Sequence, residues 1–129
     1  MLTYIDSSVA LAYLLAKIRM PAAEFWRSAL TSSRLLQYEV WNRIQTRQLD
    51  RSRHDEARTF LAGVQLIEMS EAVLARALQP FPVPVRTLDS LHLATCEFLR
   101  AQGDSVELAS YDNRLLAAAR ALAIPIAAL

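Results

Sequence analysis

The strongest candidates for chemistry in this sequence are acidic side chains from four separate segments. These are Asp6, Glu39, Asp89 and Asp112. Asp6 directly follows a predicted strand at residues 2–5, and Asp112 follows a predicted strand at residues 106–110 with one residue between them. Because ligands of an open α/β sheet bind at the carboxyl ends of its strands, we expect these two aspartates at one edge of the sheet.

The other two acids come from predicted helices. Asp89 lies in the first turn of a helix predicted over 88–102, and Glu39 lies among apolar residues of a helix predicted over 35–48. Each acid alone has a simpler interpretation, because aspartate is a good helix N-cap and Glu39 can pair with Arg43 at i+4. Four carboxylates that converge, however, are costly unless protons or cations neutralise them. Such hard oxygen ligands favour Mg²⁺ or Mn²⁺, which can activate water and stabilise a phosphoryl transition state.

Several other kinds of site are excluded. Gly63 and Gly103 are the only glycines, so the chain has no glycine-rich phosphate loop. One cysteine and two histidines cannot by themselves form a zinc site of the usual kind. Cys96 is predicted to be a packed core thiol. His92, three residues after Asp89, is interpreted as a packed or surface imidazole, and a hydrogen bond near the acids is the alternative.

The composition predicts one domain over residues 1–129. The chain is 53% apolar and 21% charged, as expected for a globular protein, and it is too short for two ordinary domains. Its longest uncharged apolar run, 9–16, is far shorter than the roughly 20 residues of a membrane-spanning helix. Asp6 lies where a signal peptide would have its apolar region. Because Cys96 is the only cysteine, we expect a reducing, cytoplasmic setting.

The basic residues are almost all arginine. Thirteen of the fourteen are arginine and Lys17 is the exception, while the net charge is only +1. Arginine binds phosphate through a planar fork. An arginine-rich, alanine-rich sequence also reflects a GC-rich genome, so the arginines are compatible with RNA binding without establishing it.

Predicted strands and helices alternate along the chain. Strands are expected over 2–5, 64–67, 106–110 and 124–129. Helices are expected over 9–16, 21–30, 35–48, 52–61, 70–79, 88–102 and from 110 or 112 to 122. Thr31–Ser33 is expected to end the second of these helices. Pro80, Pro82 and Pro84 are expected to form an extended segment that cannot be helical. The apolar face of the helix over 88–102 is expected to contain Leu88, Leu91, Thr95, Phe98 and Leu99. This alternation predicts a mostly parallel sheet that is covered on both faces.

Four local sequences resemble the PIN-domain family, and within it the VapC-type toxins of bacterial toxin–antitoxin pairs. They are Tyr4–Val9, Tyr38–Trp41, Arg86–Ala94 and Ala109–Leu115. These stretches span almost the whole chain in the order of the family. The third stretch is the most specific, and the stretch around Glu39 is the least specific.

The resemblance implies a three-layer α/β/α fold around a parallel sheet of about five strands. It also implies endonuclease activity on RNA with Mg²⁺ or Mn²⁺, in which Asp6, Glu39, Asp89 and Asp112 are the catalytic, metal-binding acids. Ser8 and Ser110 match hydroxyl residues that support the site. A cognate antitoxin and a homodimer are the implied partners, and we hypothesise that the antitoxin places a basic residue in the acidic pocket.

The sequence departs from the family pattern after Asp112. Some PIN domains carry a further acid there, whereas Asn113 and Arg114 follow in this chain. A second metal is therefore expected to be weakly held, or supplied only with RNA. Arg114 and Arg86 are candidates for contacts to RNA phosphates.

Two other functions remain open at this point. One is a PIN-like binding module that has lost catalysis, which metal binding would distinguish. The other is a Mg²⁺-binding receiver domain of a signalling protein. A receiver domain needs paired acids after its first strand and a lysine near its end, whereas serines follow Asp6 and Lys17 is the only lysine.

Overall fold

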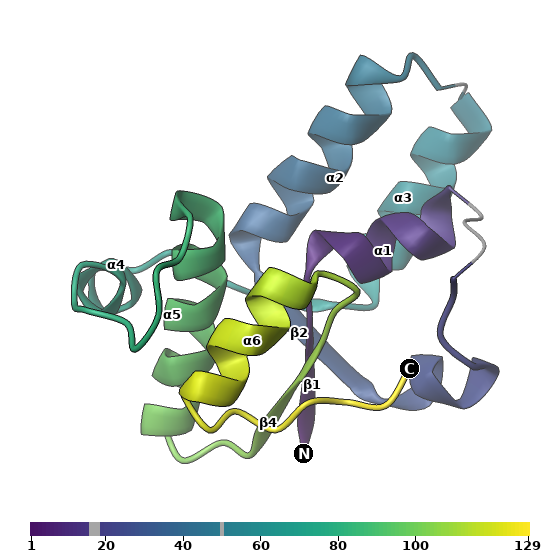
Figure 1. The fold of residues 1–129 in the computed structure, drawn as a ribbon. Helices are drawn as coiled ribbons and strands as arrows, with labels where there is room; N and C mark the ends of the chain where they lie inside the picture. Colours follow the sequence, from purple (N-terminus) through teal and green to yellow (C-terminus); the bar gives the residue numbers. More distant parts are fainter. Residues whose placement is uncertain (16–18, 50) are drawn as a thin grey trace.

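A parallel sheet lies at the centre of the molecule (Figure 1). The structure is a computed structural model that describes residues 1–15, 19–49 and 51–129. Within these residues the sheet has four strands in the spatial order β3-β2-β1-β4. The strands are β1 (Leu2–Ile5), β2 (Ala29–Ser33), β3 (Gln65–Ile67) and β4 (Val106–Ala109). Ile5 pairs with Ala109, so β1 and β4 end together at one edge of the sheet.

Helices cover both faces of the sheet (Figure 1). They are α1 (Ser7–Leu14), the 3₁₀ helix η1 (Ala23–Arg27), α2 (Arg34–Thr46), α3 (Arg51–Ala62), α4 (Glu71–Ala77), α5 (Thr87–Ala101) and α6 (Asn113–Ala121). Helices α1, α2 and α3 pack on one face, α5 and α6 pack on the other, and α4 packs against α5. The three-layer α/β/α fold is therefore confirmed.

In the part of the chain that the structure describes, no helix is long and apolar enough to cross a membrane.

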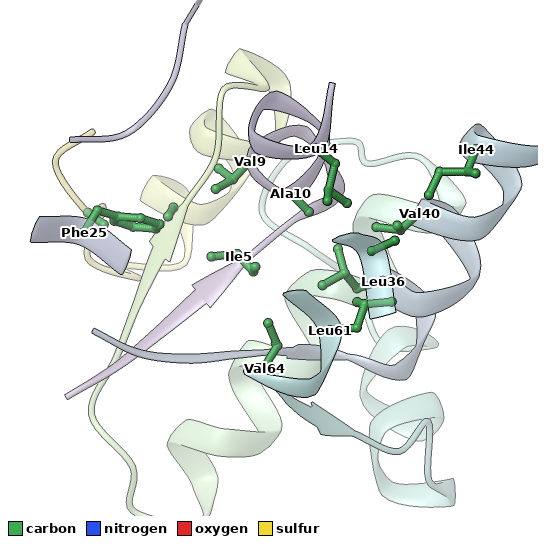
Figure 2. Packing of buried hydrophobic residues seen from close by; sticks show 13 residues of the cluster. Ile5, Val9, Ala10, Leu14, Phe25, Leu36, Val40, Ile44, Leu61 and Val64 are labelled. Atoms are coloured by element: carbon green, nitrogen blue, oxygen red, sulfur yellow. The ribbon is translucent and has the colours of Figure 1, made fainter. Parts of the chain in front are cut away.

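Two hydrophobic cores lie on opposite sides of the sheet. Successive residues of a strand face opposite sides, so Ile5 belongs to one core and Tyr4 to the other, and both are fully buried. Figure 2 shows Ile5 surrounded by side chains of the first core, including Val9 of α1 and Leu36 of α2. This double burial of β1 fixes the position of its carboxyl end, where Asp6 follows.

The helix expected over 21–30 is wrong, and so is the break at 31–33. This segment forms the short η1 followed by strand β2, which pairs with β1 on one side and β3 on the other. Thr31 and Ser32 are fully buried, and their hydroxyls donate to the carbonyls of Gln65 and Ile5. Polar residues that are typical of a turn thus form a central strand, because neighbouring strands satisfy their hydroxyls.

Among the described residues, the C-terminal segment supplies one isolated bridge to the sheet, and the sheet has four strands rather than the expected five. Ile126 bridges Leu108 of β4, with hydrogen bonds from Leu108 N–H to the Pro125 carbonyl and from Ala127 N–H to the Leu108 carbonyl. Proline has no N–H to donate. Pro125 therefore cannot extend the pairing as a regular strand residue.

Most other predicted elements are found within one to three residues of their expected limits. Asp112 is the N-cap of α6 and Ser70 is the N-cap of α4. The first helix begins at Ser7 rather than residue 9, and its expected end at Ala16 lies outside the described residues.

The expected apolar face of α5 is partly wrong. Leu88 is 48% exposed, whereas His92, Leu93 and Cys96 are buried. The reason is that α5 packs against both the sheet and α4, which widens and shifts its buried face.

Gly103 ends α5 in a conformation that disfavours other residues. Its φ is +95°, and a Cβ placed there would meet no atom within 4 Å. We therefore expect Gly103→Ala to lower the free energy of unfolding by about 1 kcal/mol through backbone strain alone. The matched control is Gly63→Ala, where a Cβ makes ordinary contact with the Phe60 carbonyl and the change should stay within about 0.5 kcal/mol. Urea denaturation measures both, and equal losses would contradict this explanation.

Candidate active site

A cavity of about 570 Å³ brings the four predicted acids together. Its lining includes Asp6, Glu39, Asp89 and Asp112. Asp6 follows β1 and caps α1, while Asp112 lies just beyond β4 and caps α6. Glu39 comes from α2 and Asp89 from the first turn of α5. The simpler roles as helix caps therefore hold for Asp6 and Asp112, but both also face the cavity.

Asp6 is the most buried of the four acids, with 5% of its surface exposed. The Ser8 hydroxyl donates to its Oδ1 at 2.6 Å and the Ser110 hydroxyl donates to its Oδ2 at 2.7 Å. Ser110 also accepts the N–H of Asp112 at 2.9 Å, so one hydroxyl connects two of the acids. Burial raises the pKa of the Asp6 carboxyl above its ordinary value, while the two serine hydroxyls and His92 oppose this shift.

Arg86 lies between Asp89 and Asp112 at the outer side of the cavity. Arg86 approaches Asp89 through Nε and Asp112 through Nη2, each at 3.4 Å. Its side chain is 62% exposed, whereas the side chain of Asp89 is only 14% exposed. The guanidinium thus offsets part of the negative charge of the acids while remaining open to solvent.

Glu39 is held by a residue that the sequence argument did not assign to the site. Nε2 of His92 lies 2.7 Å from Glu39 Oε1, and Nδ1 lies 2.6 Å from the Tyr4 hydroxyl. His92 is 3% exposed and lines the cavity. The imidazole is therefore packed, as interpreted, and it also makes the hydrogen bond near the acids that was given as the alternative. The spacing of three residues after Asp89 is the signal that places it on the same side of α5.

Two more basic residues lie around the acids. Arg43, one helical turn after Glu39, lines the main cavity. From the sequence it was predicted only as an ion-pair partner of Glu39. Arg114 does not line it. Instead, Arg114 lies with Arg86 and Asp89 around an adjoining cavity of about 310 Å³.

The acids match a hard divalent cation by chemistry, but their side chains do not surround one point. Carboxylate oxygens are the ligands that Mg²⁺ and Mn²⁺ prefer. Among residues 1–15, 19–49 and 51–129, however, no three histidine, cysteine or acidic side chains are grouped closely enough to hold a metal ion. Arg86 lies between two of the candidate ligands. Metal binding would therefore require Asp89, Asp112 and Arg86 to move, while Asp6 is already fixed.

The buried charge of Asp6 should make the metal-free protein less stable as pH rises. In the unfolded chain, the carboxyl of Asp6 loses its proton above about pH 3.9. Because the pKa of Asp6 is raised in the folded protein, the folded protein keeps this proton to a higher pH. The contribution of Asp6 to stability is thus lost as pH rises through the folded-state pKa. We expect Asp6→Asn to be at least as stable as the unsubstituted protein at neutral pH in EDTA, and to lose less stability as pH rises.

Denaturation at a series of pH values in EDTA measures this effect. Asp104→Asn, at an exposed position, is the control that should leave the pH dependence unchanged. A metal-free Asp6→Asn protein that is clearly less stable at neutral pH would show that the carboxylate stabilises the fold.

A three-layer α/β fold with an acidic cavity at the carboxyl edge of its parallel sheet is the architecture of this chain. The family model of the PIN domain matches residues 3–121 of the chain. The chain belongs to the PIN-domain family, and the sequence resemblance to that family is confirmed.

Two comparisons with individual proteins agree with this membership. The chain is 32% identical over 133 residues to the protein named ribonuclease VapC46 from Mycobacterium tuberculosis, covering 97% of this chain and 95% of that protein. It also matches a solved structure titled toxin–antitoxin complex from Klebsiella pneumoniae, with a TM-score of 0.64 and 18% identity. That match covers 89% of this chain and 90% of the other, and it shows the shared fold.

Proposed function

We propose that this protein is a metal-dependent endoribonuclease and the toxin of a VapBC-type toxin–antitoxin pair. The observation that carries the proposal is the convergence of four acids on one open cavity in a PIN-domain chain. The similarity to a protein named ribonuclease VapC46 supports RNA as the substrate. The match to a structure titled as a toxin–antitoxin complex agrees with the proposed partner.

We assign metal binding to the four carboxylates of the cavity. Asp6, Glu39, Asp89 and Asp112 would hold Mg²⁺ or Mn²⁺. When bound, such an ion activates water and offsets the negative charge that develops on the phosphate. Ser8 and Ser110 keep both oxygens of Asp6 in place, and the side chain of Asp112, which is 30% exposed, has room to reorient. A carboxylate of this group accepts the proton of the attacking water.

We assign RNA binding to arginines around the cavity. Arg86 and Arg43 line it, and Arg114 lies next to it. Guanidinium groups bind phosphate oxygens through a planar fork. We infer that the substrate is single-stranded or looped RNA, because a cavity beside a sheet edge admits splayed nucleotides more readily than a closed duplex.

Cleavage of a mixed RNA pool by the purified protein tests the proposed activity. We expect cleavage with Mg²⁺ or Mn²⁺ and none with EDTA. Cleavage that survives EDTA would contradict metal dependence. A folded protein that neither cleaves RNA nor binds Mn²⁺ would instead be the catalytically inactive binding module, which is the alternative function.

The proposed antitoxin would act by placing a basic side chain among the acids. Arg86 shows that a guanidinium can lie between Asp89 and Asp112 within this fold. An arginine or lysine from a partner would then compete with both the metal and the substrate. A structure of the complex in which no partner side chain enters the acidic cavity would contradict this mode of inhibition.

We also propose a homodimer and a cytoplasmic location. Leu74 of α4 and its C-cap residue Leu78 are 43% and 85% exposed, and large exposed apolar patches are typical of interfaces. The single cysteine, Cys96, is buried and its thiol pKa is raised by burial, so it suits a reducing compartment as a core residue. Light scattering of the purified protein measures the mass, and a monomer at all concentrations would contradict the dimer.

We retain residues 1–129 as the proposed extent of one domain.

A further inference from the structure

A chain of hydrogen bonds connects the interior of the sheet to Glu39. The backbone N–H of Ser33, at the end of β2, donates to the Tyr4 hydroxyl at 3.1 Å. The Tyr4 hydroxyl lies 2.6 Å from His92 Nδ1, and His92 Nε2 lies 2.7 Å from Glu39 Oε1. Tyr4 is fully buried and His92 is 3% exposed, so water does not compete for the two bonds of the Tyr4 hydroxyl, whereas the bond to Glu39 is part-buried at the cavity. Four elements, β1, β2, α5 and α2, therefore meet through this chain.

The donors and acceptors of the chain specify one tautomer of His92. An ionised carboxylate only accepts hydrogen bonds, so Nε2 must carry a hydrogen that it donates to Glu39. In a neutral imidazole, Nδ1 is then the acceptor, and the Tyr4 hydroxyl must donate to it. Tyr4 is able to do so because its oxygen accepts from Ser33, and because burial raises its phenol pKa and keeps the proton on the oxygen.

This tautomer leaves one oxygen of Glu39 available to the cavity. Oε1 is held by His92, whereas the one hydrogen bond of Oε2 within the described part of the chain is a long one of 3.4 Å from the Ser7 hydroxyl. The side chain of Glu39 is 15% exposed and lines the cavity together with His92. A histidine that fixes the orientation of a carboxylate in this way restricts which oxygen a cation can reach.

We propose that His92 is a positioning residue, locked by Tyr4 as the Nε2–H tautomer, that presents Glu39 Oε2 to the divalent cation. This inference rests on the proposed function for the identity of the cation. The hydrogen-bond chain itself does not depend on it, since every donor and acceptor in it belongs to this protein.

The state of the imidazole is measured directly by ¹⁵N NMR of the metal-free protein. At mildly alkaline pH, we expect Nε2 of His92 to give the signal of a protonated ring nitrogen and Nδ1 that of an unprotonated one. Tyr4→Phe should remove this strict preference. The opposite tautomer, or two protonated nitrogens, would overturn the proposal.

Two substitutions of His92 separate a positioning role from a merely structural one. The amide of glutamine reaches the position of Nε2, so His92→Gln can still donate to Glu39 but loses the bond to Tyr4. The shorter asparagine reaches the position of Nδ1, so His92→Asn keeps the bond to Tyr4 and loses the bond to Glu39. Both variants break one buried hydrogen bond, and thermal denaturation shows whether both fold.

Mn²⁺ titration followed by electron paramagnetic resonance measures the effect on the cation. We expect His92→Asn to weaken Mn²⁺ binding by at least about 10-fold, as is usual when the partner of a metal ligand is removed, and His92→Gln to weaken it by less than about threefold. In a Glu39→Gln background, His92→Asn should weaken binding no further. His54→Gln is the matched control, because His54 lies against Trp41 outside the main cavity.

The outcomes distinguish this inference from the proposed function. Equal losses in His92→Asn and His92→Gln, or an additive loss in the Glu39→Gln background, would overturn the positioning role while metal binding stands. If the unsubstituted protein binds no Mn²⁺, the proposed function fails and so does the role toward the cation, whatever tautomer the ¹⁵N spectrum shows.

Discussion

Replacing Asp89 by asparagine is expected to lower metal-dependent RNA cleavage by at least about 100-fold, or about 2.7 kcal/mol of transition-state stabilisation. Asparagine has nearly the same shape, so the substitution removes one negative charge from the cavity without removing volume. The side chain of Asp89 is 14% exposed and faces the same cavity as the other acids. The lost charge weakens the attraction for a divalent cation where water screens it only in part. Asp6→Asn should have an effect of the same order, for the same reason.

The measurement is the initial rate of cleavage of a defined RNA pool with Mg²⁺ or Mn²⁺. Asp104→Asn is the matched control, because Asp104 is exposed just before β4, at the opposite edge of the sheet from the cavity. It should cleave at the unsubstituted rate. If activity survives both Asp89→Asn and Asp6→Asn, the acidic cavity is not the active site.

Replacing Arg86 by glutamine is expected to change metal binding and RNA cleavage in opposite directions. The guanidinium lies 3.4 Å from oxygens of Asp89 and Asp112, so it competes with a cation for both. At this solvent-exposed position, one unit charge near another contributes about 1 kcal/mol, so Arg86→Gln should tighten Mn²⁺ binding by about fivefold. Cleavage should nevertheless fall, by about 10-fold or more, because a phosphate contact is lost.

Mn²⁺ titration and cleavage kinetics on the same protein samples test this pair of effects. Arg120→Gln, at an exposed position near the end of α6, is the control and should change neither. Arg86→Lys keeps the charge but loses the planar fork, so it should keep the weak Mn²⁺ binding while still cleaving slowly. If Arg86→Gln weakens Mn²⁺ binding, Arg86 supports the acids rather than competing for them.

Motifs and local patterns predicted four acids that all line one cavity, while their role in metal binding and catalysis stays a prediction. Asp6 and Asp112 each follow a strand, and the carboxyl ends of parallel strands lie at one edge of the sheet. Helix limits were also predicted well where a cap residue marks them, as Ser70 does for α4. Signals of this kind involve residues within one helical turn or one strand, so a single sequence contains them.

Strand β2 shows where local patterns fail. Apart from Thr31, its residues, Ala29–Ser33, are not strong strand formers, and the triplet Thr31–Ser33 is typical of a turn or a helix cap. The segment becomes a strand because β1 and β3 lie on either side of it and accept its hydrogen bonds. This environment exists only after distant segments have come together.

The sequence by itself determined the family, most of the alternation of strands and helices, and the two aspartates that follow strands at the carboxyl edge of the sheet. Only the tertiary structure decided how those acids are held. Tyr4 and His92 are 88 residues apart in the chain, and His92 and Glu39 are 53 residues apart. Arg86 meets Asp112 across 26 residues. The physical reason is that hydrogen bonds and ion pairs depend on distances of a few ångströms, which residue types and local spacing do not specify for side chains on different elements.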